Sequence, residues 1–366
     1  MRLSIVTFHR AFNCGARLQA WALRTVLERM GHEVAFAPVG SVGCRPTWIP
    51  LYRPGKGLRR ILWGLVANLF ALRSGRLIRH RFADFSSRYL PEWPADVRPD
   101  GAVFGSDQIW NPRLAKDEQG CFLGEELPPD VRAWAYAASA GDKPLTDADV
   151  RRLNRSVRRF EAVSVREQAV ADVLDEPWRT QACVVADPVL LVEPDDCRKI
   201  AAGVVPAEDY VFCYVLKLTP DLLRTARALA SRLNCKLVIA ENGRVTRWGA
   251  AREVIFGVSP DRFVRLVDRA RFVLTTSFHG TALSVALGRP FLSFGADREP
   301  AATRVRGLLG RLGLLSRLVG PSVPLEEIES RLQSPWPADL SRRLSEWRES
   351  SRDWLRRALE QKDPAK

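Results

Sequence analysis

The sequence is poor in the residues that build metal centres and disulfide scaffolds. Its 366 residues include four histidines, two methionines and seven cysteines. The cysteine count is odd and no pair has C-x-x-C spacing, so neither a disulfide framework nor a zinc cluster is indicated. Four scattered histidines likewise indicate no metal site. We therefore expect reduced thiols, a cytoplasmic location, no metal and no cofactor.

We expect neither a membrane-spanning helix nor a signal peptide. The start, "MRLSIVTFHRAFN", turns polar too quickly for a signal peptide and instead indicates a first β-strand. The most membrane-like segment is residues 58–82, but its apolar centre, Ile61 to Leu72, is shorter than the ~20 residues that a spanning helix needs. Basic residues flank this centre, so two alternatives stay open. It is either a core helix with a basic edge, or a helix lying on anionic lipid at the inner face of the cytoplasmic membrane.

The chain lacks a balance of charge. Lys and Arg number 56 against 42 Asp and Glu, which gives a formal net charge of +14. Arginine dominates this excess and is scattered from Arg2 to Arg357. Either these arginines form a solvated surface, or they attract anionic partners such as phosphates or an acidic membrane face. No homeodomain, zinc-finger or RNP motif is present, and we expect no nucleic-acid partner.

Apolar strands alternate with helical patterns along the first half of the chain. Strands are predicted at residues 3–8, 33–37, 101–104, 133–138, 162–166 and 182–186. A helix with apolar residues at i+4 spacing, Leu18 to Met30, separates the first two strands, and Gly31 ends it. A strand–helix–strand unit of this kind implies a parallel sheet.

A second alternation follows "DPVLLVEPDD" (187–196), whose prolines and acidic run indicate a domain exit. We predict strands at 210–216, 236–240, 252–256, 271–276 and 290–294, with helices at 220–233, at 260–269 and from Thr281. The expected fold is α/β, with two Rossmann-like domains facing a cleft. The predicted units are residues 1–192, residues 205–322, and a helical tail, 323–366, that packs back on the body. In such sheets ligands bind outside the carboxyl ends of the strands.

The stretch "TTSFHGTALS" (275–284) places a histidine between a strand and the start of a helix. Free backbone N–H groups and the helix dipole favour an anion at such a point. Ser277 and Thr281 add hydroxyl donors, and Gly280 permits close approach of the backbone. His279 is therefore a candidate ligand for a phosphate or carboxylate. The structural alternative is a capping histidine without a ligand.

An arginine occupies the same kind of position in the first half. Arg166 ends the predicted strand 162–166, just before a helical pattern that opens at Glu167. A guanidinium at the carboxyl end of a strand faces the crevice and can bind an oxyanion with two hydrogen bonds. The structural alternative is a surface salt bridge with Glu167 or Glu161.

The stretch "FGSDQIWNP" (104–112) follows another predicted strand. Gly105 makes the turn, and Ser106 and Asp107 can point into the cleft. Asp107 is a candidate general acid or base, with a helix or turn cap as the alternative. Trp110 offers a flat apolar face of the kind on which sugar rings stack.

The first strand-to-helix loop lies in "HRAFNCGARLQA" (9–20). Asn13 and Gly15 open the helix at a second site suited to an anion or a hydroxyl. The loop lacks G-x-G-x-x-G, so a dinucleotide site is not supported. Cys14 could act as a nucleophile, but a buried, unreactive thiol is the favoured interpretation.

Together these stretches resemble the polysaccharide pyruvyl transferase family. The resemblance is carried, in family order, by "NCGARLQAWAL", "GSDQIWNP", "SVRE" and "TTSFHGTALSVALGRPF", with weaker support from "YAASAG", "ADPVLL" and "TRVRGLLGRLGL". It runs from the first strand to about residue 320. The resemblance implies a GT-B-like architecture, with the acceptor on the amino-terminal domain and the anionic donor on the carboxyl-terminal domain.

The resemblance also implies a reaction in a bacterial cell. Family members move the enolpyruvyl unit of phosphoenolpyruvate onto a sugar of a cell-surface glycan, such as an exopolysaccharide, or of its lipid-linked precursor. A pyruvate ketal bridges two hydroxyls, and phosphate leaves. His279 matches the family histidine placed near phosphoenolpyruvate and Arg166 matches the arginine that holds its anionic groups. Asp107 and Asn13 match positions in the cleft.

The chain departs from the family pattern at one point. Well-studied members often read Arg-Leu-His where this chain reads Ser277-Phe278-His279, so the arginine two positions before the histidine is missing. We predict His279 and Asp107 as the catalytic pair, acid and base in either order. Two alternatives stay open. One is a GT-B-type glycosyltransferase with a nucleotide-sugar donor, and the other is a basic protein held to anionic membrane or glycan without turnover.

Overall fold

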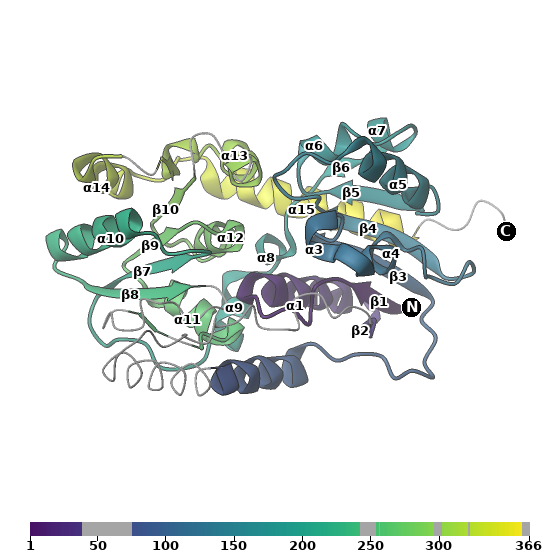
Figure 1. The fold of residues 1–366 in the computed structure, drawn as a ribbon, viewed down its shortest axis with the longest axis horizontal. Helices are drawn as coiled ribbons and strands as arrows, with labels where there is room; N and C mark the ends of the chain where they lie inside the picture. Colours follow the sequence, from purple (N-terminus) through teal and green to yellow (C-terminus); the bar gives the residue numbers. More distant parts are fainter. Residues whose placement is uncertain (39–74, 242–253, 256, 296–301, 321–322, 361–366) are drawn as a thin grey trace, which may run out of the picture.

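The computed structural model describes residues 1–38, 75–241, 254–255, 257–295, 302–320 and 323–360. In this part of the chain two parallel sheets lie side by side, and helices cover both of them (Figure 1). The amino-terminal residues form one sheet and the residues from 210 onward form the other. The limits 1–192, 205–322 and 323–366 stay a prediction about independent units.

The first sheet has the strand order β2-β1-β3-β4-β5-β6, and every neighbouring pair is parallel. Its strands are β1 (Arg2–Val6), β2 (Glu33–Phe36), β3 (Gly101–Asp107), β4 (Arg132–Ala138), β5 (Ala162–Val165) and β6 (Cys183–Val184). All six predicted strands are confirmed. The chain changes direction across the sheet between β1 and β3, and a crevice for ligands forms at the carboxyl ends of strands at such a point.

The second sheet has the order β11-β10-β9-β7-β8, again all parallel. Its strands are β7 (Tyr210–Val215), β8 (Lys236–Glu241), β9 (Phe272–Thr275), β10 (Phe291–Phe294) and β11 (Leu318–Val319). The predicted strand at 252–256 lies largely outside the described residues. Of that stretch, Val254 makes an isolated parallel bridge with Ile239.

Helices connect the strands in each sheet. They are α1 (Cys14–Arg29), α3 (Pro112–Ala115), α4 (Gln119–Leu123), α5 (Asp147–Val157), α6 (Gln168–Ala171), α7 (Trp178–Gln181), α8 (Pro188–Leu191), α9 (Pro194–Ile200), α10 (Pro220–Arg232), α11 (Pro260–Arg269), α12 (Phe278–Ala286), α13 (Ala302–Arg311), α14 (Leu325–Gln333) and α15 (Leu340–Glu360). The helix predicted from Thr281 begins three residues earlier, because Ser277 caps it by accepting a hydrogen bond from the Gly280 N–H. Hydroxyl side chains at this position satisfy N–H groups that have no partner within the helix.

One apolar core runs through both halves of the molecule. It contains Leu23 of α1, Leu190 of α8, Phe263 of α11 and Leu283 of α12. The short helix α8 packs between α1 and α12, where the two halves meet (Figure 1). Because this contact is apolar and continuous, the two sheets are held in a fixed relation near the crevice.

The last described helix returns to the amino-terminal sheet. α15 starts near the second sheet, crosses the molecule, and packs against α8 and β4 (Figure 1). The Ser351 hydroxyl accepts a 2.9 Å hydrogen bond from the Ala186 N–H, and both residues are buried. This contact fixes the chain at the exit of β6, one residue before Asp187.

The membrane-like segment is described only in part. Its residues 58–74 lie outside the described residues. From residue 75 to residue 89 the chain is helical, with Ile78, Phe82 and Phe85 buried in the core. Among the helices described, none combines the length and the apolar character needed to cross a bilayer.

Candidate functional site

Arg166 lies at the carboxyl end of β5, and its side chain is 2% exposed. Its Nη1 donates a 3.0 Å hydrogen bond to Asp187 Oδ2, and its Nη2 lies 3.5 Å from Asp107 Oδ1. Burial lowers the pKa of this guanidinium, but the neighbouring carboxylates outweigh burial and raise it. The predicted alternative of a surface salt bridge is wrong about the location, because the side chain is buried. Of its two partners, Glu161 pairs with Arg132 instead, whereas Glu167 Oε2 lies 3.9 Å from Arg166 Nε.

Asp187 interacts with a charged group from the amino-terminal half and with a histidine from the carboxyl-terminal half. Its Oδ1 accepts a hydrogen bond from the Val189 N–H at 3.0 Å, and its Oδ2 accepts one from Ser106 Oγ at 3.2 Å. The same Oδ2 lies 3.6 Å from Nε2 of His279, across the domain boundary. Burial raises the pKa of this carboxyl group, but His279 and Arg166 reverse that effect and hold the pKa well below its usual value. Asp187 is therefore a buried carboxylate that links a guanidinium to an imidazole.

His279 is the second residue of α12 and so lies in the first turn, at the helix N-terminus where the sequence places it. Its side chain is 8% exposed, and within the described residues its Nε2 has no hydrogen-bond partner. The ring lies directly against Gly15. A Cβ atom on Gly15 would lie 2.4 Å from the Cγ and Nδ1 atoms of His279. Glycine at this position allows the starts of α1 and α12 to touch.

The start of α1 is shaped by its cap. Asn13 Oδ1 accepts hydrogen bonds from the N–H groups of Gly15, at 2.9 Å, and Ala16, at 3.2 Å. The Cys14 thiol donates to the Val258 carbonyl oxygen at 3.3 Å, and burial raises its pKa to about 12. Cys14 is buried, as the favoured interpretation of its thiol predicts. Asn13 and Gly15 lie beside His279, where the sequence places a second ligand-binding loop.

The predicted polar residues of α12 bind one another. Ser277 Oγ accepts a 3.3 Å hydrogen bond from the Gly280 N–H, and Thr281 Oγ1 donates to the Ser277 carbonyl oxygen at 3.1 Å. Thr281 also shares a 2.6 Å hydrogen bond with Ser293. A Cβ atom on Gly280 would lie 2.3 Å from Thr275 Oγ1. These contacts position α12 and its histidine on the second sheet.

The end of β3 brings Asp107 to Arg166, but the loop that follows takes Trp110 away. Asp107 has a φ of 79°, a conformation that is strained for a residue other than glycine and that is frequent at functional sites. Ser106 is fully buried and faces Asp187. Trp110 is 1% exposed and packs in a core cluster with Phe122, so the predicted sugar-stacking role is wrong. Because neighbouring side chains cover the Trp110 ring, a sugar ring cannot stack on it.

A cavity of about 300 Å³ opens beside this cluster. Among the predicted site residues, all of which the structure describes, only Arg166 lines it. The charged and aromatic side chains that line it include Arg166, Glu167, Asp187, Phe278, Arg304 and Arg311. Phe278 brings the two domains together here, because the Arg166 guanidinium carbon lies 4.5 Å from the centre of its ring.

Glu167 is a further carboxyl group in the site, which the sequence indicates only as an ion-pair partner of Arg166. Its Oε1 accepts hydrogen bonds from Ser139 Oγ at 2.7 Å and from the Ala140 N–H at 3.1 Å. Burial raises its pKa, although Arg166 acts in the opposite direction.

The signal that could have identified Asp187 is the "ADPVLL" stretch, in which an aspartate follows a strand and precedes a helix-opening proline.

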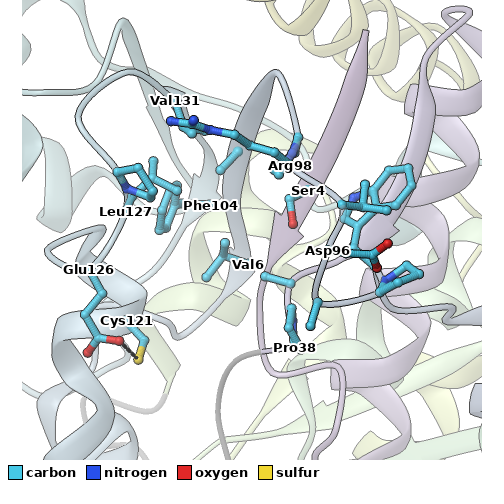
Figure 2. Close-up of a pocket in the computed structure, with 18 residues that line it drawn as sticks. Ser4, Val6, Pro38, Asp96, Arg98, Phe104, Cys121, Glu126, Leu127 and Val131 are labelled. Carbon is cyan, nitrogen blue, oxygen red and sulfur yellow. Dashed lines mark hydrogen bonds between the residues drawn. The ribbon is translucent and has the colours of Figure 1, made fainter.

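A larger cavity, of about 410 Å³, lies elsewhere on the first sheet (Figure 2). It is lined by side chains such as Val6, Phe104 and Leu127, and by the segments that precede β3 and β4. Arg166, Asp187, His279 and Asp107 are not among the residues that line it. On its wall, Cys121 donates a hydrogen bond to Glu126 at 2.9 Å (Figure 2). We therefore place the functional site at Arg166 and Asp187, not at this cavity.

The cluster around Asp187 can bind an anion and transfer protons. Arg166 supplies a guanidinium, His279 an imidazole, and Asp107 and Glu167 two further carboxyl groups. Across the described parts of the chain, no group of three or more His, Cys, Asp or Glu side chains is arranged to hold a metal ion. General acid–base catalysis needs groups of these kinds within reach of the reacting atoms.

Solved structures with a related fold include a UDP-N-acetylglucosamine 2-epimerase. It is 12% identical, with a TM-score of 0.51, and the match covers 99% of this chain and 96% of that one. A spinosyn rhamnosyltransferase matches at 15% identity with a TM-score of 0.49, over 99% of this chain and 100% of its own. A glycosyltransferase from Streptomyces nogalater matches at 15% identity with a TM-score of 0.48, over 98% of each chain. With the two parallel sheets, the likeness to the epimerase confirms the predicted two-domain, GT-B-like α/β fold.

The sequence matches one protein family along most of its length. Among proteins with curated descriptions, none matches it significantly. The model of the polysaccharide pyruvyl transferase family matches residues 13–298, which contain Arg166, Asp187 and His279. Because this match spans most of the chain and both sides of the site, the chain belongs to the polysaccharide pyruvyl transferase family and is an enzyme of that family.

Proposed function

We propose that this enzyme transfers the enolpyruvyl group of phosphoenolpyruvate to two hydroxyls of a sugar, in a cell-surface glycan or its lipid-linked precursor. The observation that carries the proposal is the Arg166–Asp187–His279 cluster, in which both domains contribute to one buried charged site. Phosphoenolpyruvate carries a phosphate and a carboxylate, and guanidinium groups bind both with strong hydrogen bonds. The adjoining cavity of about 300 Å³ is at the small end of ligand sites, which favours a small anion over a nucleotide sugar.

The proposed reaction balances without a further reactant. One sugar hydroxyl adds to C2 of the enolpyruvyl group, and C3 takes a proton and becomes a methyl group. The bond between C2 and the phosphate oxygen then breaks, and the second hydroxyl adds to C2 to close the ketal. The two hydroxyls release two protons, of which one is matched by the proton on C3 and the other leaves with phosphate.

His279 and Asp107 are the groups that we assign to proton transfer. The Asp187 carboxylate, 3.6 Å from His279 Nε2, orients the ring and stabilises the imidazolium that forms when the ring takes up a proton. His279 then binds the anionic donor or supplies the proton for C3. Asp107 lies 3.5 Å from Arg166 on the amino-terminal side, where we place the acceptor, and acts as the base. If the roles are the reverse, the pH–rate profiles of His279→Gln and Asp107→Asn lose the opposite limbs.

Ligand-dependent unfolding tests the donor without knowledge of the acceptor. Phosphoenolpyruvate at about a hundred times its dissociation constant should stabilise the protein by ~2.7 kcal/mol. His279→Gln and Arg166→Lys should remove most of this gain, whereas Arg151→Lys, an exposed change on α5, should leave it intact. Protection by a nucleotide sugar, with none by phosphoenolpyruvate, would replace the proposed donor and identify a glycosyltransferase.

The proposal also includes a place of action in the cell. We place the enzyme in the cytoplasm, in peripheral contact with the inner face of the cytoplasmic membrane, where a lipid-linked acceptor would be reached. The formal net charge of +14 supports attraction to anionic lipid. Co-sedimentation with phosphatidylserine vesicles should fall as salt rises. Binding to vesicles by a protein that turns over no substrate would instead favour the alternative of a non-enzymatic membrane protein.

A further inference from the structure

The cavity beside Arg166 has a second cationic wall that the proposed mechanism does not use. Arg304 and Arg311 lie on α13 of the carboxyl-terminal half, and both line this cavity. The guanidinium carbons of Arg304 and Arg166 lie 5.8 Å and 4.5 Å from the centre of the Phe278 ring. Ser277, which precedes Phe278, carries no charge. The cationic charge that the carboxyl-terminal half presents to the cavity therefore comes from α13.

Both arginines of α13 are held in place by further contacts, Arg304 by Asp142 and Arg311 by Trp347 in the cavity wall. The Arg304 side chain is 12% exposed and forms an ion pair with Asp142 of the amino-terminal half. The Arg304 N–H also donates to Asp142 Oδ1, at 3.3 Å. The Arg311 guanidinium carbon lies 5.0 Å from the centre of the Trp347 ring of α15. Guanidinium groups fixed in this way lose little conformational freedom when they bind a ligand.

The cavity lining holds three basic and two acidic side chains, namely Arg166, Arg304 and Arg311 with Asp187 and Glu167. Arg166 has Asp187 at 3.0 Å and Arg304 has Asp142 as ionic partners. Arg311 contacts the ring of Trp347, which carries no charge. An anion in the cavity would give the Arg311 guanidinium a counter-charge.

Beside this cavity lie buried guanidinium atoms that form no hydrogen bond, although Arg166 Nη2 is 3.5 Å from Asp107 Oδ1 and Arg166 Nε is 3.9 Å from Glu167 Oε2. Within the part of the chain that the structure describes, Nε and Nη2 of Arg166 and Nε of Arg304 have no hydrogen-bond partner. Buried donors are nearly always paired, so unpaired ones require an explanation. Three such atoms on two guanidinium groups next to one cavity are suited to the oxygens of a single oxyanion.

The geometry points to a phosphate subsite in this cavity, with Arg304 and Arg311 on one side, Arg166 on the other and the Phe278 ring as an apolar wall. Arg304 and Arg311 are thus residues that determine specificity for a phosphorylated donor. The identity of that donor as phosphoenolpyruvate rests on the proposed function. The subsite itself recognises a phosphate dianion, and inorganic phosphate tests it alone.

Titration calorimetry with inorganic phosphate and with phosphoenolpyruvate measures both steps. Arg304→Gln and Arg311→Gln should each weaken phosphate binding by about ten- to a hundredfold, the range for loss of hydrogen bonds to a charged group. The matched control is Arg306→Gln, because Arg306 is exposed on the same helix and does not line the cavity. Arg304→Lys keeps the charge opposite Asp142 and should weaken binding less. Unfolding midpoints without ligand show that each variant folds.

The outcomes separate this subsite from the proposed function. Unchanged phosphate and phosphoenolpyruvate affinity in folded Arg304→Gln and Arg311→Gln would overturn the subsite and leave phosphoenolpyruvate as the donor. Phosphate binding that both variants lose, with no binding of phosphoenolpyruvate to the wild type, would support the subsite and overturn the donor. Failure of the wild type to bind either anion would overturn both.

Discussion

Replacing Gly15 with alanine tests whether α1 and α12 must touch beside His279. In a helix, alanine is ordinarily favoured over glycine by up to about 1 kcal/mol. Here the added Cβ would lie 2.4 Å from Cγ and Nδ1 of His279 and 2.6 Å from its Cβ. Overpacking of a close contact costs about 1–3 kcal/mol. The steric cost exceeds the helical gain, and the free energy of unfolding should fall by about 1–2 kcal/mol.

Urea unfolding followed by tryptophan fluorescence measures this change, since the chain contains 11 tryptophans. The matched control is Gly310→Ala in α13, where the nearest heavy atom to an added Cβ is Leu315 Cδ2 at 3.9 Å. This control should gain up to about 1 kcal/mol from helix propensity. Because the clash displaces His279, Gly15→Ala should also lose protection by phosphoenolpyruvate. A Gly15→Ala protein as stable as Gly310→Ala, with normal ligand protection, would refute the close contact.

Three further predictions concern titratable groups. Asp187→Asn removes the carboxylate nearest to the buried Arg166 guanidinium, and the free energy of unfolding near neutral pH should fall by about 3–5 kcal/mol in urea titrations; a loss below about 1 kcal/mol would contradict this. Because the folded pKa of Asp187 is lowered, its contribution is present above the unfolded pKa of ~3.9 and is lost as pH falls, so the deficit of Asp187→Asn should shrink below about pH 4. The pKa of Glu167 is raised in the folded protein, so the wild type should lose stability as pH rises above ~4.3. The stability of Glu167→Gln relative to the wild type should therefore increase between about pH 5 and pH 8. A difference in urea midpoint between the two proteins that is the same at both ends of this range would exclude the shift. Iodoacetamide at about pH 8 should alkylate exposed Cys183 but not Cys14, whose pKa is raised to about 12, and peptide mass spectrometry that found Cys14 labelled first would contradict its burial.

The sequence predicts the sheets and three of the site residues because parallel sheets obey a positional rule. Apolar runs give the strands, and the carboxyl ends of parallel strands meet at one edge. Arg166, Asp107 and His279 each follow such a run, and the structure brings all three to Asp187 or to its partner Arg166. A local pattern was sufficient because the topology places these loops together.

The remaining features depend on packing between distant segments. The sequence around Asp187 is typical of a domain exit, and only the packing of α12 beside this segment shows that the Asp187 carboxylate faces His279. Trp110 lies in a stretch whose sequence is typical of a sugar-binding loop, but its ring packs in a core cluster with residues of α4 and β3. Arg304 lies in "TRVRGLLGRLGL", which supports the family resemblance but indicates no site, and its contacts with Phe278 and Asp142 come from other segments. No spacing along the chain encodes these contacts.

The path of α15 gives the enzyme an order of assembly during synthesis. Residues emerge from the ribosome in sequence, and amino-terminal domains generally fold first. The Ala186 N–H and the Leu190 carbonyl, on either side of Asp187, are bound by Ser351 and Arg348 of α15. A nascent chain can therefore complete its first sheet long before the segment that carries Asp187 is locked. Until α15 has been made, the segment that carries Asp187 lacks both contacts, so the site takes its final form only after both sheets have been synthesised.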